Sequence, residues 1–138
     1  MEWNTNFETG QTRLDAEHRR LLELIGAFDQ EIERGTSLES LEEVLRQIRQ
    51  YSESHFQNEE RLMDAIAFPE ADAHRELHRM LLAALKDLMQ AISFESLPPA
   101  ELLKFLVTRY IEHICDEDKA LGRFLNSLAP EGKAAGAA

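Results

Sequence analysis

Apolar residues recur at helical spacing through the first half of the chain. One stripe covers residues 14–32 and stops before Gly35, a residue type that commonly ends helices. The next stripe is longer and ends before Phe68. It is preceded by Thr36 and Glu39, which have the spacing of a capping box. The pattern therefore predicts two long helices joined by a short link.

The second half of the chain has the same spacing. A third stripe covers residues 77–92, and a fourth covers residues 102–114. Pro98 and Pro99 precede the fourth stripe and suit the first turn of a helix. A shorter apolar set at residues 121–128 predicts a short helix at the C-terminal end.

Short connections between long helices force sequence neighbours to pack antiparallel. The predicted fold is therefore all-α, an up-down-up-down antiparallel four-helix bundle with a short C-terminal helix. No internal repeat interrupts the pattern, so residues 1–128 are predicted to form one domain. Residues 129–138 are small and weakly patterned, and we expect them to form a flexible tail.

The balance of charge narrows the possible partners. The 26 acidic and 15 basic residues give a net charge of -11, which repels nucleic acid and anionic membrane surfaces. No run of apolar residues is long enough to span a bilayer, and the first residues do not resemble a secretion signal. We therefore expect a cytoplasmic protein with no nucleic-acid or membrane partner.

The single cysteine, Cys115, excludes an internal disulfide and a thiolate cluster. A metal bound to this chain would need nitrogen and oxygen ligands. Five histidines interrupt the apolar stripes and are predicted to point inward. They are His18, His55, His74, His78 and His113.

Two pairs of polar residues have the spacing of a chelate. His74 and His78, like His55 and Glu59, are four residues apart, which places both members on one helix face about 5 to 6 Å apart. Asp118 is five residues after His113, and a regular helix would turn it well off the histidine face. We therefore predict a distortion or a break of the helix between Cys115 and Asp118.

An inward histidine taken alone is more simply a core residue with one hydrogen-bond partner. Five of them with two carboxylates would make a heavily polar core, in which unpaired charges cost several kcal/mol each. A metal accounts for all seven residues together. Seven donors exceed the needs of one first-row ion, whereas two ions that share bridging carboxylates use them fully.

Four segments of the chain resemble the hemerythrin family, and in their order the single-domain bacterial members. These segments are LDAEH at residues 14–18, HFQNEERLM at 55–63, HRELH at 74–78 and HICDED at 113–118. The resemblance implies two iron ions with a bridging oxide or hydroxide.

The resemblance also assigns the ligands by position. One iron would take His74, His78 and His113, the other would take His18 and His55, and Glu59 and Asp118 would bridge both. Counting the bridges gives six ligands to the first iron and five to the second. The second iron would therefore have a free position for dioxygen.

A dry pocket beside that position would need apolar walls. Leu21, Phe56 and Ile114 lie close to the ligands in sequence and are candidates, although each is equally explained as bundle core. Arg109 stands where many family members carry tryptophan, four residues before the last histidine. Its side chain either approaches the open position, where it would favour small anions such as azide, or points outward to an acidic neighbour, which is the favoured alternative.

Two other positions bear on the ligand histidines. Glu17 stands where relatives commonly have glutamine, and an acidic residue such as Glu112 could support a ligand histidine from outside the ligand set. The change at Glu17 removes no predicted ligand.

The resemblance implies reversible binding of dioxygen for storage, delivery or sensing, and not an enzyme. The main alternative is a di-iron enzyme with oxidase, peroxidase or nitric oxide handling activity on the same site. An iron store and a metal-free helical interaction module are two further alternatives. They predict easily removed metal and no metal, respectively.

Overall fold

The computed structural model describes residues 7–128, apart from the side chains of Ile114 and Cys115. Three uninterrupted helices, α1, α2 and α3, are followed by a fourth rod of five consecutive segments. The bounds are α1 Thr12–Arg34, α2 Leu38–Ala65, α3 Ala71–Ser93, α4 Pro99–Phe105, η2 Leu106–Tyr110, α5 Ile111–His113, η3 Ile114–Asp118 and α6 Lys119–Leu128. The segments η2 and η3 are single turns of π-helix.

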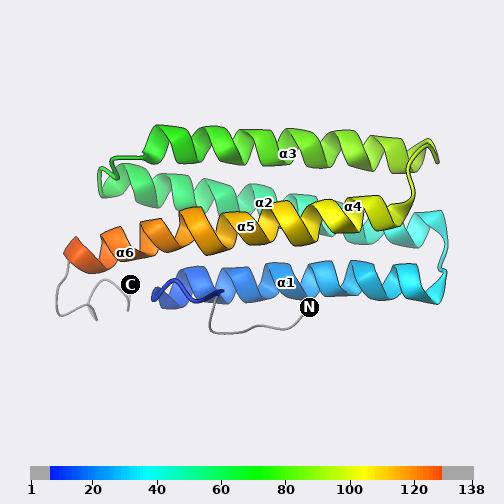
Figure 1. Cartoon of the computed structure of the whole chain (residues 1–138), viewed down its shortest axis with the longest axis horizontal. Helices are drawn as coiled ribbons and strands as arrows, with labels where there is room; N and C mark the ends of the chain where they lie inside the picture. Colours follow the sequence, from blue (N-terminus) through cyan, green and yellow to red (C-terminus); the bar gives the residue numbers. More distant parts are fainter. Residues whose placement is uncertain (1–6, 129–138) are drawn as a thin grey trace.

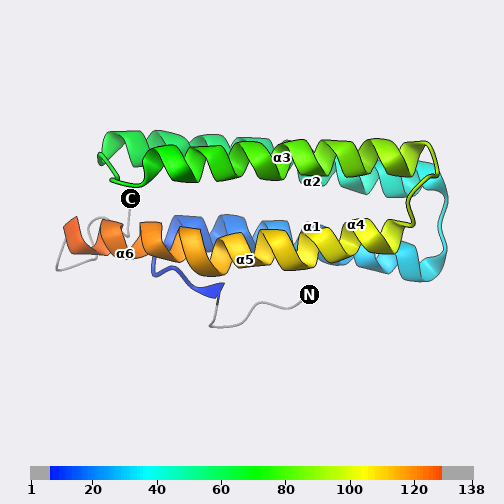
Figure 2. The ribbon, with the colours of Figure 1, turned by 45° about the horizontal axis from the view of Figure 1, so that its top comes forward.

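The four rods lie side by side, and successive rods run in opposite directions (Figure 1). A second view, turned about the long axis, shows the same packing (Figure 2). The predicted all-α bundle is confirmed. The predicted C-terminal helix is α6, which follows η3 without a break and extends the fourth rod. None of the described helices combines the length and the apolarity needed to cross a membrane.

The helix ends follow local chemistry. Gly35 has a left-handed backbone (φ 65°), and its N–H and that of Thr36 donate to the last turn of α1. The predicted capping box at Thr36 is wrong by one residue. Ser37 is the N-cap of α2 and accepts a hydrogen bond from the N–H of Ser40, while Thr36 donates its hydroxyl to the Glu31 carbonyl. Pro99 occupies the first turn of α4, as predicted.

Two main apolar clusters fill most of the bundle, and a polar layer lies between them; a third cluster is small. The larger cluster includes Phe28 and Ile48, and the smaller one includes Leu14 and Met63. Every rod passes through both clusters. On α1, for example, the buried His18 lies between Leu14 of the smaller cluster and Leu21 of the larger one. The helices are thus held by apolar packing above and below the polar layer.

The segment before α1 is fastened across the end of the bundle. The backbone N–H and the hydroxyl of Thr9 both donate to one oxygen of Asp15, at 2.9 and 2.8 Å. Gln11 reaches across to α6 and donates its amide to Asn126 at 2.8 Å. Gly122 of α6 allows this close approach, because a Cβ built there would lie 2.4 Å from the Thr9 carbonyl oxygen.

Gly122→Ala is expected to destabilise the protein by roughly 1 to 3 kcal/mol, even though alanine is the better helix former. The new Cβ would meet backbone, which cannot move aside as a flexible side chain can. Thermal unfolding measures the change. Ser127→Ala is the control on α6, since this exposed hydroxyl bonds only its own helix at Phe124. A Gly122→Ala protein that is as stable as the native chain would contradict the close contact.

Candidate metal centre

Seven polar side chains meet in the layer between the two apolar clusters, and all four rods contribute. None is more than 4% exposed. They are His18 of α1, His55 and Glu59 of α2, His74 and His78 of α3, His113 of α5 and Asp118 of η3. These are the seven residues that the sequence predicts as ligands, and the structure brings all of them together in two groups that could each hold a metal ion.

The first of these, the three-histidine group, contains His74, His78 and His113. Their Nε2 atoms lie around one oxygen of each carboxylate. Oε1 of Glu59 is 3.3 Å from His74 and 3.0 Å from His78. Oδ1 of Asp118 is 3.0 Å from His74 and 2.9 Å from His113. The Nε2 atoms of His78 and His113 are only 3.1 Å apart, so the rings converge on one point.

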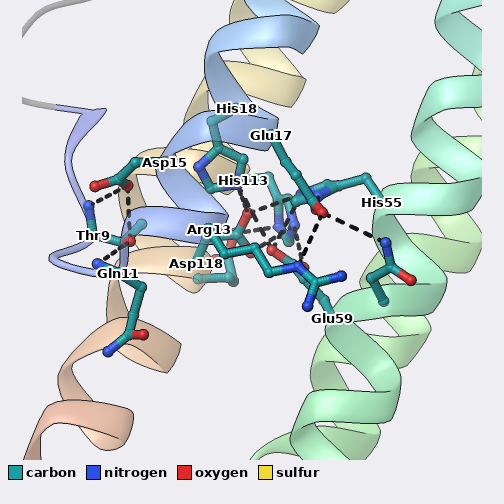
Figure 3. A network of polar contacts seen from close by, with 12 residues as sticks. Thr9, Gln11, Arg13, Asp15, Glu17, His18, His55, Glu59, His113 and Asp118 are labelled. Carbon is teal, nitrogen blue, oxygen red and sulfur yellow. Dashed lines mark hydrogen bonds and ion pairs between the residues drawn. The ribbon is translucent and has the colours of Figure 1, made fainter. Parts of the chain in front are cut away.

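The second, the two-histidine group, contains His18 and His55. Oδ2 of Asp118 is 2.7 Å from Nε2 of His18, and Oε2 of Glu59 is 3.2 Å from Nε2 of His55. Figure 3 shows these side chains turned toward one another. Each carboxylate thus directs one oxygen to each group. That is the arrangement in which a carboxylate bridges two metal ions.

The π-helical turn η3 explains how Asp118 joins the site. In a π-helix the backbone hydrogen bond connects residues five apart, so residues five apart lie nearly above one another. The turn covers Ile114–Asp118 and aligns Asp118 with His113. A regular α-helix would have turned the carboxylate away from the histidines. The predicted distortion is confirmed, and it is a widened turn and not a break.

The buried atoms of the site fit a pair of cations. Both oxygens of Glu59, Oδ1 of Asp118, and Nε2 of His55 and of His74 are buried and have no hydrogen-bond partner. Buried polar atoms without a partner are costly, and a metal ion would satisfy them. Imidazole nitrogens with bridging carboxylates suit first-row transition metals, iron among them. The donor set therefore fits two such ions.

In the metal-free protein, protons on the histidines would partly replace the metal ions as partners of the buried carboxylates. Burial lowers the pKa of His74, but the neighbouring carboxylates of Asp118 and Glu59 outweigh burial and raise the pKa to about 9. The same balance raises the pKa of His55 and His113 well above the usual value. Burial raises the pKa of Glu59 and Asp118, but the histidines around them hold both values well below their usual range. A metal ion must therefore displace protons.

Two histidines donate their outer nitrogen to a carboxylate. Nδ1 of His55 donates to Glu17 at 2.5 Å, and Nδ1 of His78 donates to Glu60 at 2.8 Å. Such hydrogen bonds fix the orientation of a ligand ring and leave its Nε2 free for metal. The sequence marked Glu17 as unusual but gave no sign of Glu60, which comes from the neighbouring helix.

The third outer carboxylate is Glu117, whose oxygen lies 3.4 Å from Nδ1 of His113. Sequence reasoning considered Glu112 for such a role, but Glu112 is exposed. Glu117 is four residues after His113, and this spacing was the signal that could have identified it.

Phe56 separates the site from the larger apolar cluster. Its ring stacks on His78, with centroids 3.9 Å apart, and lies within 6 Å of His55 and His113. Leu21 is also buried there. Both predicted wall residues therefore lie in the dry interior, while the side chain of Ile114 falls outside the described part of the chain.

Of the two placements that the sequence allows for Arg109, the structure has the outward one, so this side chain does not line the predicted pocket. The π-turn η2 shifts the register of the fourth rod, so that Arg109 is exposed and Tyr110 is buried. The Tyr110 ring lies 6.1 Å from that of Phe56. Burial raises the pKa of Tyr110 to about 12, so its hydroxyl stays protonated at neutral pH. Tyr110 therefore lies on the buried face of the fourth rod, next to Phe56.

Comparison with known proteins adds an independent finding. The family model described as the hemerythrin HHE cation binding domain matches residues 9–125. The chain is 25% identical over 118 residues to a bacteriohemerythrin of Pseudomonas paraeruginosa, which covers 84% of this chain and 75% of the relative. It is 24% identical over 122 residues to a bacteriohemerythrin of Clostridium acetobutylicum, with 85% and 95% covered. A myohemerythrin of Theromyzon tessulatum is 29% identical over 100 residues, with 72% and 78% covered.

Proposed function

This chain belongs to the hemerythrin family, and from that premise we propose that it binds dioxygen reversibly at a non-haem di-iron centre. Members of this family are mainly iron proteins that bind dioxygen, and not enzymes. Storage, delivery or sensing of dioxygen would each use such a centre. Small anions such as azide would compete with dioxygen for the open position.

The proposal depends mainly on one observation, which is that each of the two carboxylates is shared by both groups of histidines. Glu59 and Asp118 each present one oxygen to the three-histidine group and the other to the two-histidine group. We propose that each group holds one iron ion and that both carboxylates bridge the ions. Because one group has a nitrogen donor fewer than the other, its ion keeps a position for dioxygen.

The surroundings of the site favour binding over further chemistry. Five neutral imidazoles and two carboxylates supply less negative charge than a carboxylate-rich set, and highly oxidised iron is harder to reach with them. Phe56 and Leu21 keep water away from the inner side of the site, which slows loss of the bound ligand. Arg109, the residue that departs from the usual family pattern, is exposed and does not reach the site.

The proposal predicts a reversible colour change. Protein loaded with two ferrous ions per chain and reduced without oxygen should gain a visible absorption band when dioxygen is admitted. The band should fade when dioxygen is withdrawn, over repeated cycles. Metal-free protein, treated in the same way, is the control and should stay colourless.

Each other outcome would contradict the proposal in a distinct way. A band that forms once and does not reverse would favour the di-iron enzyme. Iron that mild chelators remove would favour an iron store. Purified protein that takes up no metal would leave a helical interaction module.

A further inference from the structure

Glu17 joins the two-histidine group to the surface of the bundle. Its Oε1 accepts the 2.5 Å hydrogen bond from His55, and its Oε2 is 3.5 Å from the amide nitrogen of Asn58 and 3.8 Å from Arg13. In Figure 3 the carboxylate lies between Arg13 and His55. The Glu17 side chain is 18% exposed, whereas that of His55 is 1% exposed. The carboxylate therefore contacts water on one side and a deeply buried ring on the other.

A cavity of about 350 Å³ reaches this carboxylate from solvent. Glu17, Arg13 and Asn58 line it together with Glu59, one of the two carboxylates shared by both groups. Contact with water through the cavity makes a negative charge at Glu17 less costly than a charge buried in the core. Glu17 thus presents its carboxylate to His55 on one side and to water on the other.

The two histidines of this group differ in their outer contacts. Nδ1 of His18 is buried and has no hydrogen-bond partner among the described residues, whereas Nδ1 of His55 donates to Glu17. A carboxylate on Nδ1–H fixes the ring and raises the basicity of the other nitrogen. Any such effect on the two-histidine group therefore acts through His55.

We propose that Glu17 is a positioning residue that makes His55 a stronger donor, and so strengthens metal binding in the two-histidine group and favours the oxidised state of its ion. This rests on the proposed di-iron centre. A charged partner strengthens His55 more than a neutral amide would, and the extra electron density stabilises ferric over ferrous iron. Because dioxygen binding draws electron density from this ion, Glu17 also favours retention of dioxygen.

Two variants separate the hydrogen bond from the charge. Glu17→Ala removes both, and should weaken binding of one of the two metal ions about 10- to 100-fold, as is typical for loss of such a partner. A titration with Co²⁺, which needs no redox step, measures this. Glu17→Gln keeps an acceptor but not the charge. In the iron-loaded protein it should shift the reduction potential to a more positive value and speed release of dioxygen.

Two matched variants serve as controls. Glu60→Gln makes the same change at His78, and should therefore weaken binding of the metal ion in the three-histidine group. Glu23→Gln removes an exposed charge from α1, where Glu23 pairs with Arg20, and should leave affinity and potential unchanged. Native protein that binds two ions, with Glu17 variants of unaltered affinity and potential, would overturn this inference alone. Native protein that binds no metal would overturn it together with the proposed function.

Discussion

Glu59→Gln is expected to leave the chain with no more than one tightly bound metal ion instead of two. Each oxygen of Glu59 faces a different histidine group, and both are buried without a hydrogen-bond partner. An amide offers one neutral oxygen, and its nitrogen is not a ligand. The affinity for the more weakly bound ion should fall at least about 100-fold, because loss of a hydrogen-bond partner of a ligand alone lowers affinity 10- to 100-fold. Metal analysis after dialysis measures the stoichiometry.

The control for this substitution is Glu76→Gln on α3. It makes the same chemical change at an exposed carboxylate that pairs with Arg79. Circular dichroism shows whether each variant keeps its helices. A folded Glu59→Gln protein with two ions per chain would show that Glu59 does not bridge them.

The fold and the core of the site could be predicted because both depend on short-range spacing. Apolar stripes at helical spacing place four helices, and the four-residue spacing of His74 and His78 places both rings on one face. The five-residue spacing of His113 and Asp118 conflicted with an α-helix, and this conflict located the distortion that the structure has as η3. A violation of local regularity was therefore informative about the site.

The features that sequence reasoning missed depend on the rotation of one rod against another. The fourth rod contains the π-helical turn η2 at Leu106–Tyr110, and no local residue pattern announced it. Glu60 reaches His78 from a neighbouring helix, so its role depends on the register of α2 against α3. A change of one residue in register moves a side chain by about 100° around the helix, and spacing along one helix cannot report it.

The position of the polar layer explains why the bundle can carry it. Unpaired charges in a core cost several kcal/mol each, so seven polar side chains would ordinarily destabilise a domain of this size. Here histidines and carboxylates from four rods lie at ion-pair distance from one another, and each rod is held by apolar residues above and below. In the metal-free protein this balance depends on protons shared between histidines and carboxylates. The stability of that form should therefore depend on pH.

The sign of the dependence follows from the direction of each pKa. Burial lowers the pKa of His74, but the neighbouring carboxylates outweigh burial and raise it from 6.5 to about 9. This contribution is fully present below pH 6.5 and is lost as the pH rises through about 9, and it amounts to about 3 kcal/mol. The lowered pKa of Glu59 and of Asp118 contributes stability above their ordinary values of 4.5 and 3.8, which is lost in acid.

Above pH 6, we therefore expect stability to fall with rising pH in the metal-free protein but not in the metal-loaded protein. The metal-free protein should unfold at a lower temperature at pH 9.5 than at pH 6, because protonated histidines hold its carboxylates. The metal-loaded protein should be at least as stable at pH 9.5, since metal needs unprotonated ligands, and should lose metal and stability below about pH 5. Thermal unfolding of both forms across this range measures the difference, and charges elsewhere affect both forms alike. Curves that fall together toward pH 9.5 would show that protons and metal do not compete for these histidines.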